Sequence, residues 1–399
     1  MAASTNKRIY YAVQTVGIKP DGDTSWAAAD IIKGLQSVGM TTTFNLTQVF
    51  ELGQLSIYEN IEGIPNIECS LNKVLDGRPL IWHMATQGTT TTSPSLSGRS
   101  NTNCIVGLSI YTDTADEASA ATPDSMCEMS GMFPSSLAYN FPLEDSFNEE
   151  VTLVGNNKVW AGDSRIDAAA VGIWTGAQDL DAVAGFTAGS IDSPDGLGGV
   201  NQRENMRFTQ DPTTGADANG MYRDPNVTIL PPEVFGISSS GLNLKSDGQN
   251  FDAHVTNISC STDLGREEQF ELGRRGQYNR TVTFPIEVTC EIEVTSTSGD
   301  MISATEFGIL ATGNDTCSDA NNLTDRTIRI ATCEGTRISL GVKNKLASVS
   351  YGGGDAGGGN VSATYTYTNF NDFTVLHSGD PHASGTTWWT NREDYLVVN

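Results

Sequence analysis

The sequence predicts a mainly β protein made of two similar β domains in tandem, and three observations support this prediction. Gly, Ser, Thr and Asn are abundant and only 18% of the 399 residues are charged, a usage that favours strands and turns over long helices. Apolar and polar residues alternate along several segments near both ends of the chain. A segment close to the N-terminus also recurs 220 residues later.

The repeat is clearest around a shared Phe-Glu-Leu-Gly. The chain has VFELGQLSIYENIEGIP from Val49 and QFELGRRGQYNRTVTFP from Gln269. Without gaps, residues 35–74 share eight identities in forty with residues 255–294. This similarity extends well beyond the tetrapeptide, so it favours a duplicated domain over a chance match. A chance match of a common tetrapeptide is the alternative.

Strands are predicted from period-two patterns. In 286–294 every second residue from Ile286 to Val294 is apolar, and the residues between them are Glu and Thr, as in a strand with one buried face. Residues 360–376 alternate in the same way. Residues 104–113 and 326–335 read as further strands, and 40–52 alternates loosely. Helical patterns are sparse, and the best candidates are residues 76–87 and 24–39.

A segment rich in turn-forming residues separates two regions that are rich in predicted strands. Residues 1–160 and 227–376 contain most of the predicted strands. Residues 161–226 are rich in Gly, Ala and Asp and are predicted to be an insertion and linker. Residues 377–399 follow as a C-terminal extension.

Charge and motifs exclude several classes of function. The formal net charge of −25 disfavours high-affinity binding of nucleic acid, because such a field repels phosphates. No P-loop, HExxH or nucleophile-elbow motif occurs. The one metal-like cluster, at His377, Asp380 and His382, is read as a polar turn. We therefore expect no catalytic, cofactor-binding or metal-binding residues, and no enzyme.

The N-terminus and the cysteines bear on location. No apolar signal region and no apolar run of about 20 residues occurs, so we expect neither secretion by a signal peptide nor membrane insertion. Seven cysteines without a CxxC pair are expected to be mostly free thiols in a reducing cytoplasm.

Residues 44–86, FNLTQVFELGQLSIYENIEGIPNIECSLNKVLDGRPLIWHMAT, resemble tail tube proteins of long-tailed bacteriophages. The segment that ends at Trp160 is similar to the last strand pair of such a domain. The stretches FELGRRGQY, FPIEVTCEIEV and VSATYTYTNFNDF resemble the same domain again. The resemblance implies two tail-tube-like β-barrel or sandwich domains, each with a short helix, that give strands to an oligomeric ring β-barrel. It also implies rings stacked around a DNA channel, and a two-domain chain could close a six-fold ring with three copies.

Two sets of residues follow as hypotheses. The loops after the shared tetrapeptide are expected to stack one ring on the next, through Glu51, Gln54, Tyr58, Glu59, Glu271, Arg274 and Tyr278. The solvent-exposed face of the 286–294 strand is expected to line an acidic channel, through Glu287, Glu291 and Glu293. The negative charge of such a channel would keep DNA phosphates from binding to its wall. The alternatives are ordinary surface loops and Glu residues that face the outer solvent.

The resemblance also sets the expected partners and location. The chain would assemble with itself in the cytoplasm of the host and reside in the virion tail, and DNA would pass without specific binding. Tail sheath, tape-measure, baseplate and terminator proteins are further partners. A baseplate hub, a tail terminator or a neck ring protein is an alternative, and a carbohydrate-active or carbohydrate-binding β-sandwich is an alternative of another class.

Overall fold

The structure is a computed structural model that describes twelve stretches and Trp26: residues 8–21, 30–76, 78–86, 95–111, 125–162, 206–208, 253–273, 277–296, 328–332, 336–341, 343–353 and 361–377. Strands dominate these residues, which confirms the mainly β prediction. The helices among them are short: the 3-10 helix η1 (Tyr11–Val13), α1 (Ile81–Ala85) and α2 (Leu96–Arg99).

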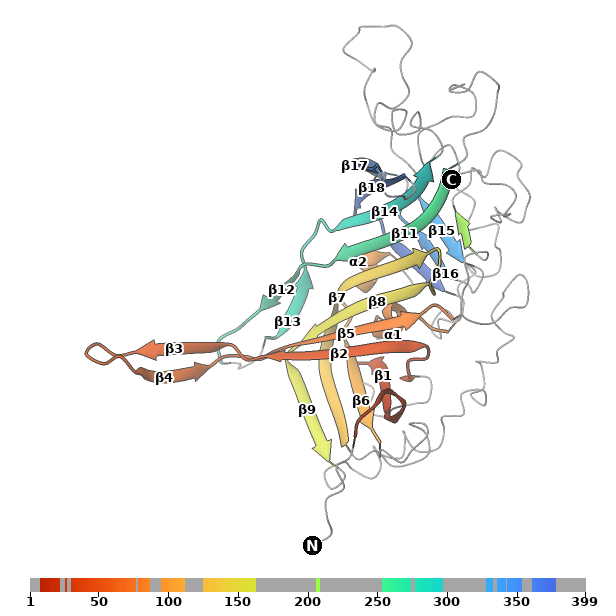
Figure 1. The fold of residues 1–399 in the computed structure, drawn as a ribbon. Coiled ribbons are helices and arrows are strands. Elements are labelled where there is room, and N and C mark those ends of the chain that lie inside the picture. Colours follow the sequence, from red (N-terminus) through yellow and green to blue (C-terminus); the bar gives the residue numbers. More distant parts are fainter. Residues whose placement is uncertain are drawn as a thin grey trace, which may run out of the picture.

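One antiparallel sheet runs through both predicted domains (Figure 1). Its strand order is β17-β18-β14-β11-β7-β8-β5-β2. The strands are β2 (Leu35–Thr43), β5 (Asn66–Val74), β7 (Ser125–Pro142), β8 (Asn148–Gly155), β11 (Ala253–Asp263), β14 (Glu287–Ser296), β17 (Lys345–Gly352) and β18 (Ser362–Phe370). We call β1–β9 unit 1 and β10–β19 unit 2, and the two units meet where β7 pairs with β11.

A further set of strands accompanies this sheet in each unit. In unit 1, β1 (Gln14–Pro20), β6 (Cys104–Ile110), the first part of β7 and β9 (Asn157–Gly162) pair in that order. In unit 2, β10 (Met206–Phe208), β15 (Arg329–Thr332), β16 (Thr336–Ser339) and β19 (Thr374–His377) pair in that order. Strand β10 therefore lies inside the range predicted as a linker.

The two units have the same strand order throughout. The series β2-β5-β8-β7 of unit 1 corresponds to β11-β14-β18-β17 of unit 2. Irregularities in register also correspond. Gln36 and Thr256 interrupt the first strands, and Ser135 and Ala347 interrupt the hairpin strands β7 and β17. β-Bulges are specific features of a strand, so their matching positions align the units more firmly than strand order alone.

The structure corrects the gapless alignment of the repeat. Met40 lies opposite Cys69 in unit 1, and Cys260 lies opposite Cys290 in unit 2. The first strands are thus offset by 220 residues and the second strands by 221. The difference arises because the connection 283–286 is one residue longer than the connection 63–65. Cys69 and Cys290 are therefore equivalent, although they are one residue out of phase in the ungapped comparison.

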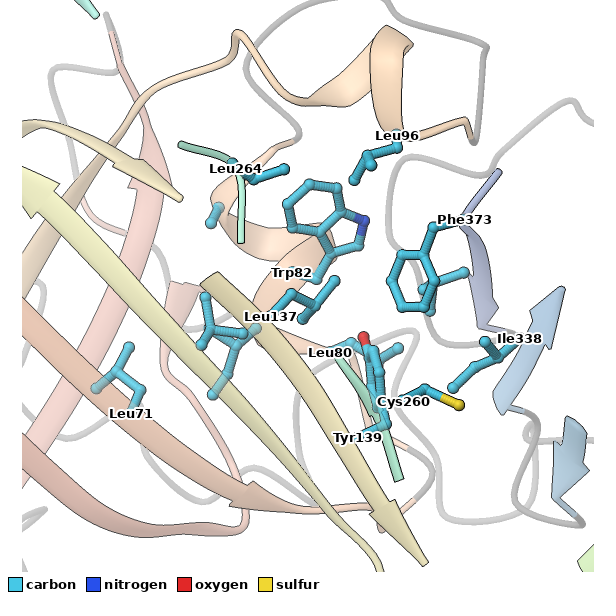
Figure 2. Close-up of a cluster of buried hydrophobic side chains, with 14 of the residues drawn as sticks. Leu71, Leu80, Trp82, Leu96, Leu137, Tyr139, Cys260, Leu264, Ile338 and Phe373 are labelled. Carbon is cyan, nitrogen blue, oxygen red and sulfur yellow. The ribbon is translucent and has the colours of Figure 1, made fainter. Parts of the chain in front are cut away.

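Buried faces agree with the alternation in the sequence. Val288, Cys290 and Ile292 are at most 1% exposed, and Ala363, Tyr365 and Tyr367 are also buried. The main core cluster contains residues of both units, including Leu71 and Trp82 of unit 1 and Cys260, Ile338 and Phe373 of unit 2 (Figure 2). This shared core holds the two units together as one body.

The prediction of a helix in 76–87 is confirmed by α1, whereas the helix predicted for 24–39 is wrong in its second part, where β2 begins at Leu35. The apolar residues of that segment fit a strand because β2 pairs along its length with β5. Among the described residues, none of the helices has the length and apolar character needed to cross a bilayer.

Candidate functional site

Two hairpins emerge from the sheet at equivalent places. We call β3 (Leu46–Phe50) with β4 (Ile57–Glu62) the long arm, and β12 (Arg266–Gln269) with β13 (Asn279–Val282) the short arm. Figure 1 shows the long arm extending well away from the body of the molecule. Both arms turn at the repeated Phe-Glu-Leu-Gly, where Gly53 and Gly273 have φ values of +101° and +88°. Glycine adopts this conformation without the strain that a side chain would add.

The arms carry apolar side chains that the rest of the described structure leaves exposed. Leu52 and Leu55 are each 103% exposed, and Leu272 is 104% exposed. Further exposed apolar residues of the long arm are Leu46, Phe50, Ile57, Tyr58 and Ile61. Exposed apolar side chains in this number on one hairpin are typical of a site where another protein binds.

The predicted stacking residues lie on these arms. Glu51, Gln54, Tyr58 and Glu59 are exposed on the long arm, where the Gln54 side chain donates to Glu51 Oε2 at 2.7 Å. Glu271 and Tyr278 are exposed on the short arm, and Arg274 lies outside the described residues. The sequence-based prediction missed the leucines, although Leu52 and Leu272 belong to the repeated tetrapeptide and could have been noticed there.

The base of the short arm is fixed to unit 1 by two arginines. The guanidinium of Arg266 donates to the carbonyls of Pro134 and Ser100. Arg280 pairs with Glu268 and donates to Asn66 Oδ1 at 2.8 Å. Burial, and to a smaller extent the charge of Arg280, lowers the pKa of Arg266 to about 9.

The long arm lacks this chemistry. At the positions of Arg266, Glu268 and Arg280 it has Leu46, Gln48 and Asn60. Since Leu46 is 57% exposed, the base of the long arm presents an apolar contact where the short arm has buried cations.

The face of the large sheet opposite the core is polar and acidic. Glu287 and Glu291 are exposed, and Glu293 is half-buried on the same side of β14. Neighbouring positions on this face are mostly Ser, Thr and Asn, and the other acidic residues there are Glu68, Glu150 and Asp263. Lys345 is the single basic residue on this face among the described strands. Glu68 and Glu150 were missed because their strands alternate less cleanly in sequence.

Carboxylates occupy matching places in the two units. Asn72 lies opposite Glu150 in unit 1 and donates to its Oε1 at 2.7 Å. The equivalent pair in unit 2 is Glu293 opposite Thr364. Each of these equivalent cross-strand pairs thus contains one carboxylate, which is on β8 in unit 1 and on β14 in unit 2.

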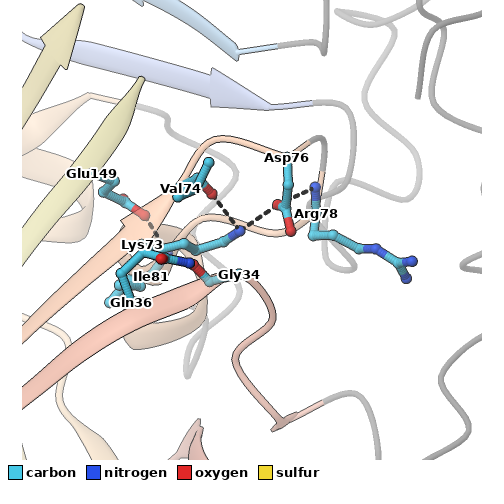
Figure 3. Close-up of polar contacts among 8 residues, drawn as sticks. All are labelled: Gly34, Gln36, Lys73, Val74, Asp76, Arg78, Ile81 and Glu149. Atoms are coloured by element: carbon cyan, nitrogen blue, oxygen red, sulfur yellow. Dashed lines mark hydrogen bonds and ion pairs between the residues drawn. The ribbon is translucent and has the colours of Figure 1, made fainter. Parts of the chain in front are cut away.

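A buried polar network supports the strands behind this face (Figure 3). Glu149 accepts hydrogen bonds from the backbone N–H groups of Ile81 (2.7 Å) and Trp82 (3.1 Å) and from the Tyr139 hydroxyl (2.8 Å). Burial raises the pKa of Glu149, and these hydrogen bonds oppose the rise. Lys73, also buried, pairs with Asp76. The network fixes α1 to the end of the sheet.

The predicted channel and arm residues do not converge on a reaction centre. Among the described residues, no group of three or more His, Cys, Asp or Glu is arranged to hold a metal ion. His377 is buried near His83, and Asp380 and His382 lie outside the described residues.

No family model matches this chain, and no curated protein matches it either. Several solved structures are similar to part of it. The sheath–tube complex of an extracellular contractile injection system (PVC) is 12% identical, with a TM-score of 0.28, over 40% of this chain and 94% of its own. The tube-terminating cap of the anti-feeding prophage is 13% identical, with a TM-score of 0.28, over 41% and 99%. The anti-feeding prophage baseplate is 10% identical, with a TM-score of 0.29, over 40% and 98%. Similarity at this level leaves the function to be argued from the geometry of the chain.

Proposed function

We propose that this chain is a structural subunit of a phage-tail-like tube, in which rings of the chain stack around a channel. The observation that carries the proposal is the continuous sheet in which one four-strand series occurs twice, as β2-β5-β8-β7 and then β11-β14-β18-β17. Among the described strands, β17 and β2 are the two edges of this sheet. A sheet of repeated series closes naturally into a barrel when copies join in a ring.

Duplication of one tube domain explains the strand order and the matching bulges. If each unit occupies one of six similar places, three copies of the chain complete a ring with pseudo-six-fold symmetry. The two arms of each copy then lie at equivalent heights around the ring. A ring that contains six whole copies would contradict this arrangement.

The exposed face of the sheet fits the wall of a channel for DNA. Its acidic residues lie among Ser, Thr and Asn, and such a surface offers phosphates few cationic contacts. Glu150 and Glu293 belong to equivalent cross-strand pairs, so copies in a ring would carry carboxylates at the same height along the channel. The arms, with their uncovered leucines, would bury apolar surface against the next ring.

Electron microscopy of the purified protein at high concentration tests the proposal. We expect rings or tubes with a central hole and three-fold symmetry in class averages viewed down the axis. Compact particles without a hole would contradict a tube subunit. Copy number in the assembled particle is a further test, because a tube protein occurs in many rings whereas a hub, terminator or neck protein occurs in few. We place the protein in the tail of the particle after assembly in the host cytoplasm.

A further inference from the structure

The large sheet ends in two edge strands that match the two sides of its own internal joint. Strand β7 pairs with β11 where the units meet, and the equivalents of these strands are β17 and β2, at opposite ends of the sheet. We propose that β17 of one copy pairs antiparallel with β2 of a second copy and reproduces the β7–β11 joint between chains. This inference rests on the proposed function and names the partner of both edges.

We call the proposed β17–β2 contact between copies the external joint. The register of the internal β7–β11 joint predicts its register. Ala138 of β7 lies opposite Ser261 of β11. The bulges at Gln36 and Thr256 align β2 with β11 at an offset of 220 residues, so Ser261 corresponds to Thr41. The bulges at Ser135 and Ala347 align β7 with β17 at an offset of 212, so Ala138 corresponds to Ser350. Thr41 of one copy therefore lies opposite Ser350 of the next.

Side chains that are buried at the internal joint have exposed equivalents at the two edge strands, as expected if the edges are covered only after copies pair. Leu264 is fully buried at the internal joint and its N–H donates to Ser135 O at 2.8 Å, whereas the equivalent Phe44 is 68% exposed. Tyr139 is likewise fully buried, whereas the equivalent Tyr351 is 59% exposed. Pairing of the edges would cover both aromatic rings and bring the backbones of the two edge strands into one ladder.

The chemistry of the external joint differs from that of the internal one. The internal joint includes the hydrogen bonds from Arg266 to Ser100 and Pro134 of unit 1. At the external joint Leu46 takes the place of Arg266, next to Phe44. The hydrogen bonds of Arg266 therefore have no counterpart at the external joint, where Phe44 and Leu46 are apolar and Lys345 takes the place of Phe133.

Engineered cysteines at the predicted pair test the register. Ser261 and Ala138 are each three residues from the hydrogen-bonded Leu264 and Ser135, so they form a non-hydrogen-bonded pair, in which Cα atoms lie about 4.5 Å apart. The equivalent T41C/S350C variant should form an inter-chain disulfide when glutathione disulfide is added, which is reduced as the Sγ–Sγ bond forms. Both sites are exposed and tolerate the change. The control, T41C/S348C, also uses two exposed positions but is two residues out of register.

The outcomes separate this inference from the proposed function. We expect T41C/S350C to give a covalent ladder that ends at a closed ring on a non-reducing gel, with at least tenfold less product from T41C/S348C or from either single variant. Equal cross-linking of the two double variants would overturn the register. Tubes in the microscope without cross-linking would overturn the joint and leave the tube intact. Absence of both cross-links and particles would overturn both proposals.

A second variant tests the same joint without cysteines. Phe44→Glu places a charge at the position of buried Leu264, and we expect it to abolish ring closure and leave a folded single chain in sedimentation velocity. Tyr11→Glu is the matched control, because Tyr11 is 91% exposed and lies outside the edges and the arms. Rings of normal size from the Phe44→Glu protein would overturn the inference.

Discussion

Removal of the two leucines at the tip of the long arm should block stacking without harm to the fold. Leu52 and Leu55 are fully exposed, so Leu52→Ser with Leu55→Ser takes no packing from the free chain. Burial of one Leu side chain contributes about 1.5–3 kcal/mol, so loss of both costs a stacked chain about 3–6 kcal/mol. Because each 1.4 kcal/mol is a factor of ten in an equilibrium constant, the critical concentration for polymerisation should rise about 100-fold or more.

The assay is pelleting of polymer over a range of protein concentrations, beside urea unfolding of the unassembled chain. We expect the unfolding free energy of the variant to stay within about 0.5 kcal/mol of the wild type. Tyr11→Ser is the control, since Tyr11 is a large side chain that is 91% exposed and lies away from the arms. An unchanged critical concentration in the double variant, with normal folding, would refute the stacking role of the long arm.

Three further predictions concern buried and channel residues. Glu149→Ala leaves three buried donors without an acceptor and should lower the urea-unfolding free energy by at least about 3 kcal/mol; a loss below 1 would contradict the network. Burial raises the pKa of Glu149, so the stability that its protonated form contributes is fully present below the ordinary pKa of 4.5 and is lost as pH rises. Thermal melts at increasing pH should therefore show the wild type losing stability relative to Glu149→Gln, which does not titrate. Arg266→Met should cost about 2–4 kcal/mol and expose the base of the short arm to protease, whereas Leu46→Met, the matched change on the long arm, should cost less than 1. Glu291→Lys with Glu293→Lys should slow DNA release from particles, and unchanged kinetics would remove these residues from the channel.

The strands and their buried faces were predictable because period-two alternation follows directly from strand geometry. The segment from Ile286 to Val294 has the face that the pattern indicates. The repeat also indicated which segments are equivalent, but an ungapped comparison could not reveal the extra residue in 283–286. That residue shifts the second strand by one position, and the buried Cys69 and Cys290 regain phase only when cross-strand partners are known.

Other features depend on contacts distant in sequence and had no local signal. Strand β10 has three residues and exists through its pairing with β15, more than 100 residues away. The helix predicted for 24–39 fails because Leu35 and Val38 suit either period until β5 supplies the partner strand. The repeat marked Leu52 and Leu272 as equivalent, but their exposure could not be predicted, since an apolar residue near a strand is usually expected to join the core. The channel and stacking roles of the predicted residues remain predictions.

The long strand β7 gives unit 1 a mechanical property that separate layers would lack. One backbone of 18 residues pairs with β6 and β9 in its first part and with β8 and β11 in its second, and it bends between them near Gly131, where φ is +64°. A force on the β1-β6-β9 group is therefore transmitted to the β8 and β11 group through the backbone of β7 and not only through side-chain contacts. The two layers cannot slide past each other unless several ladders of hydrogen bonds break together, so the wall built from such units resists shear as one piece.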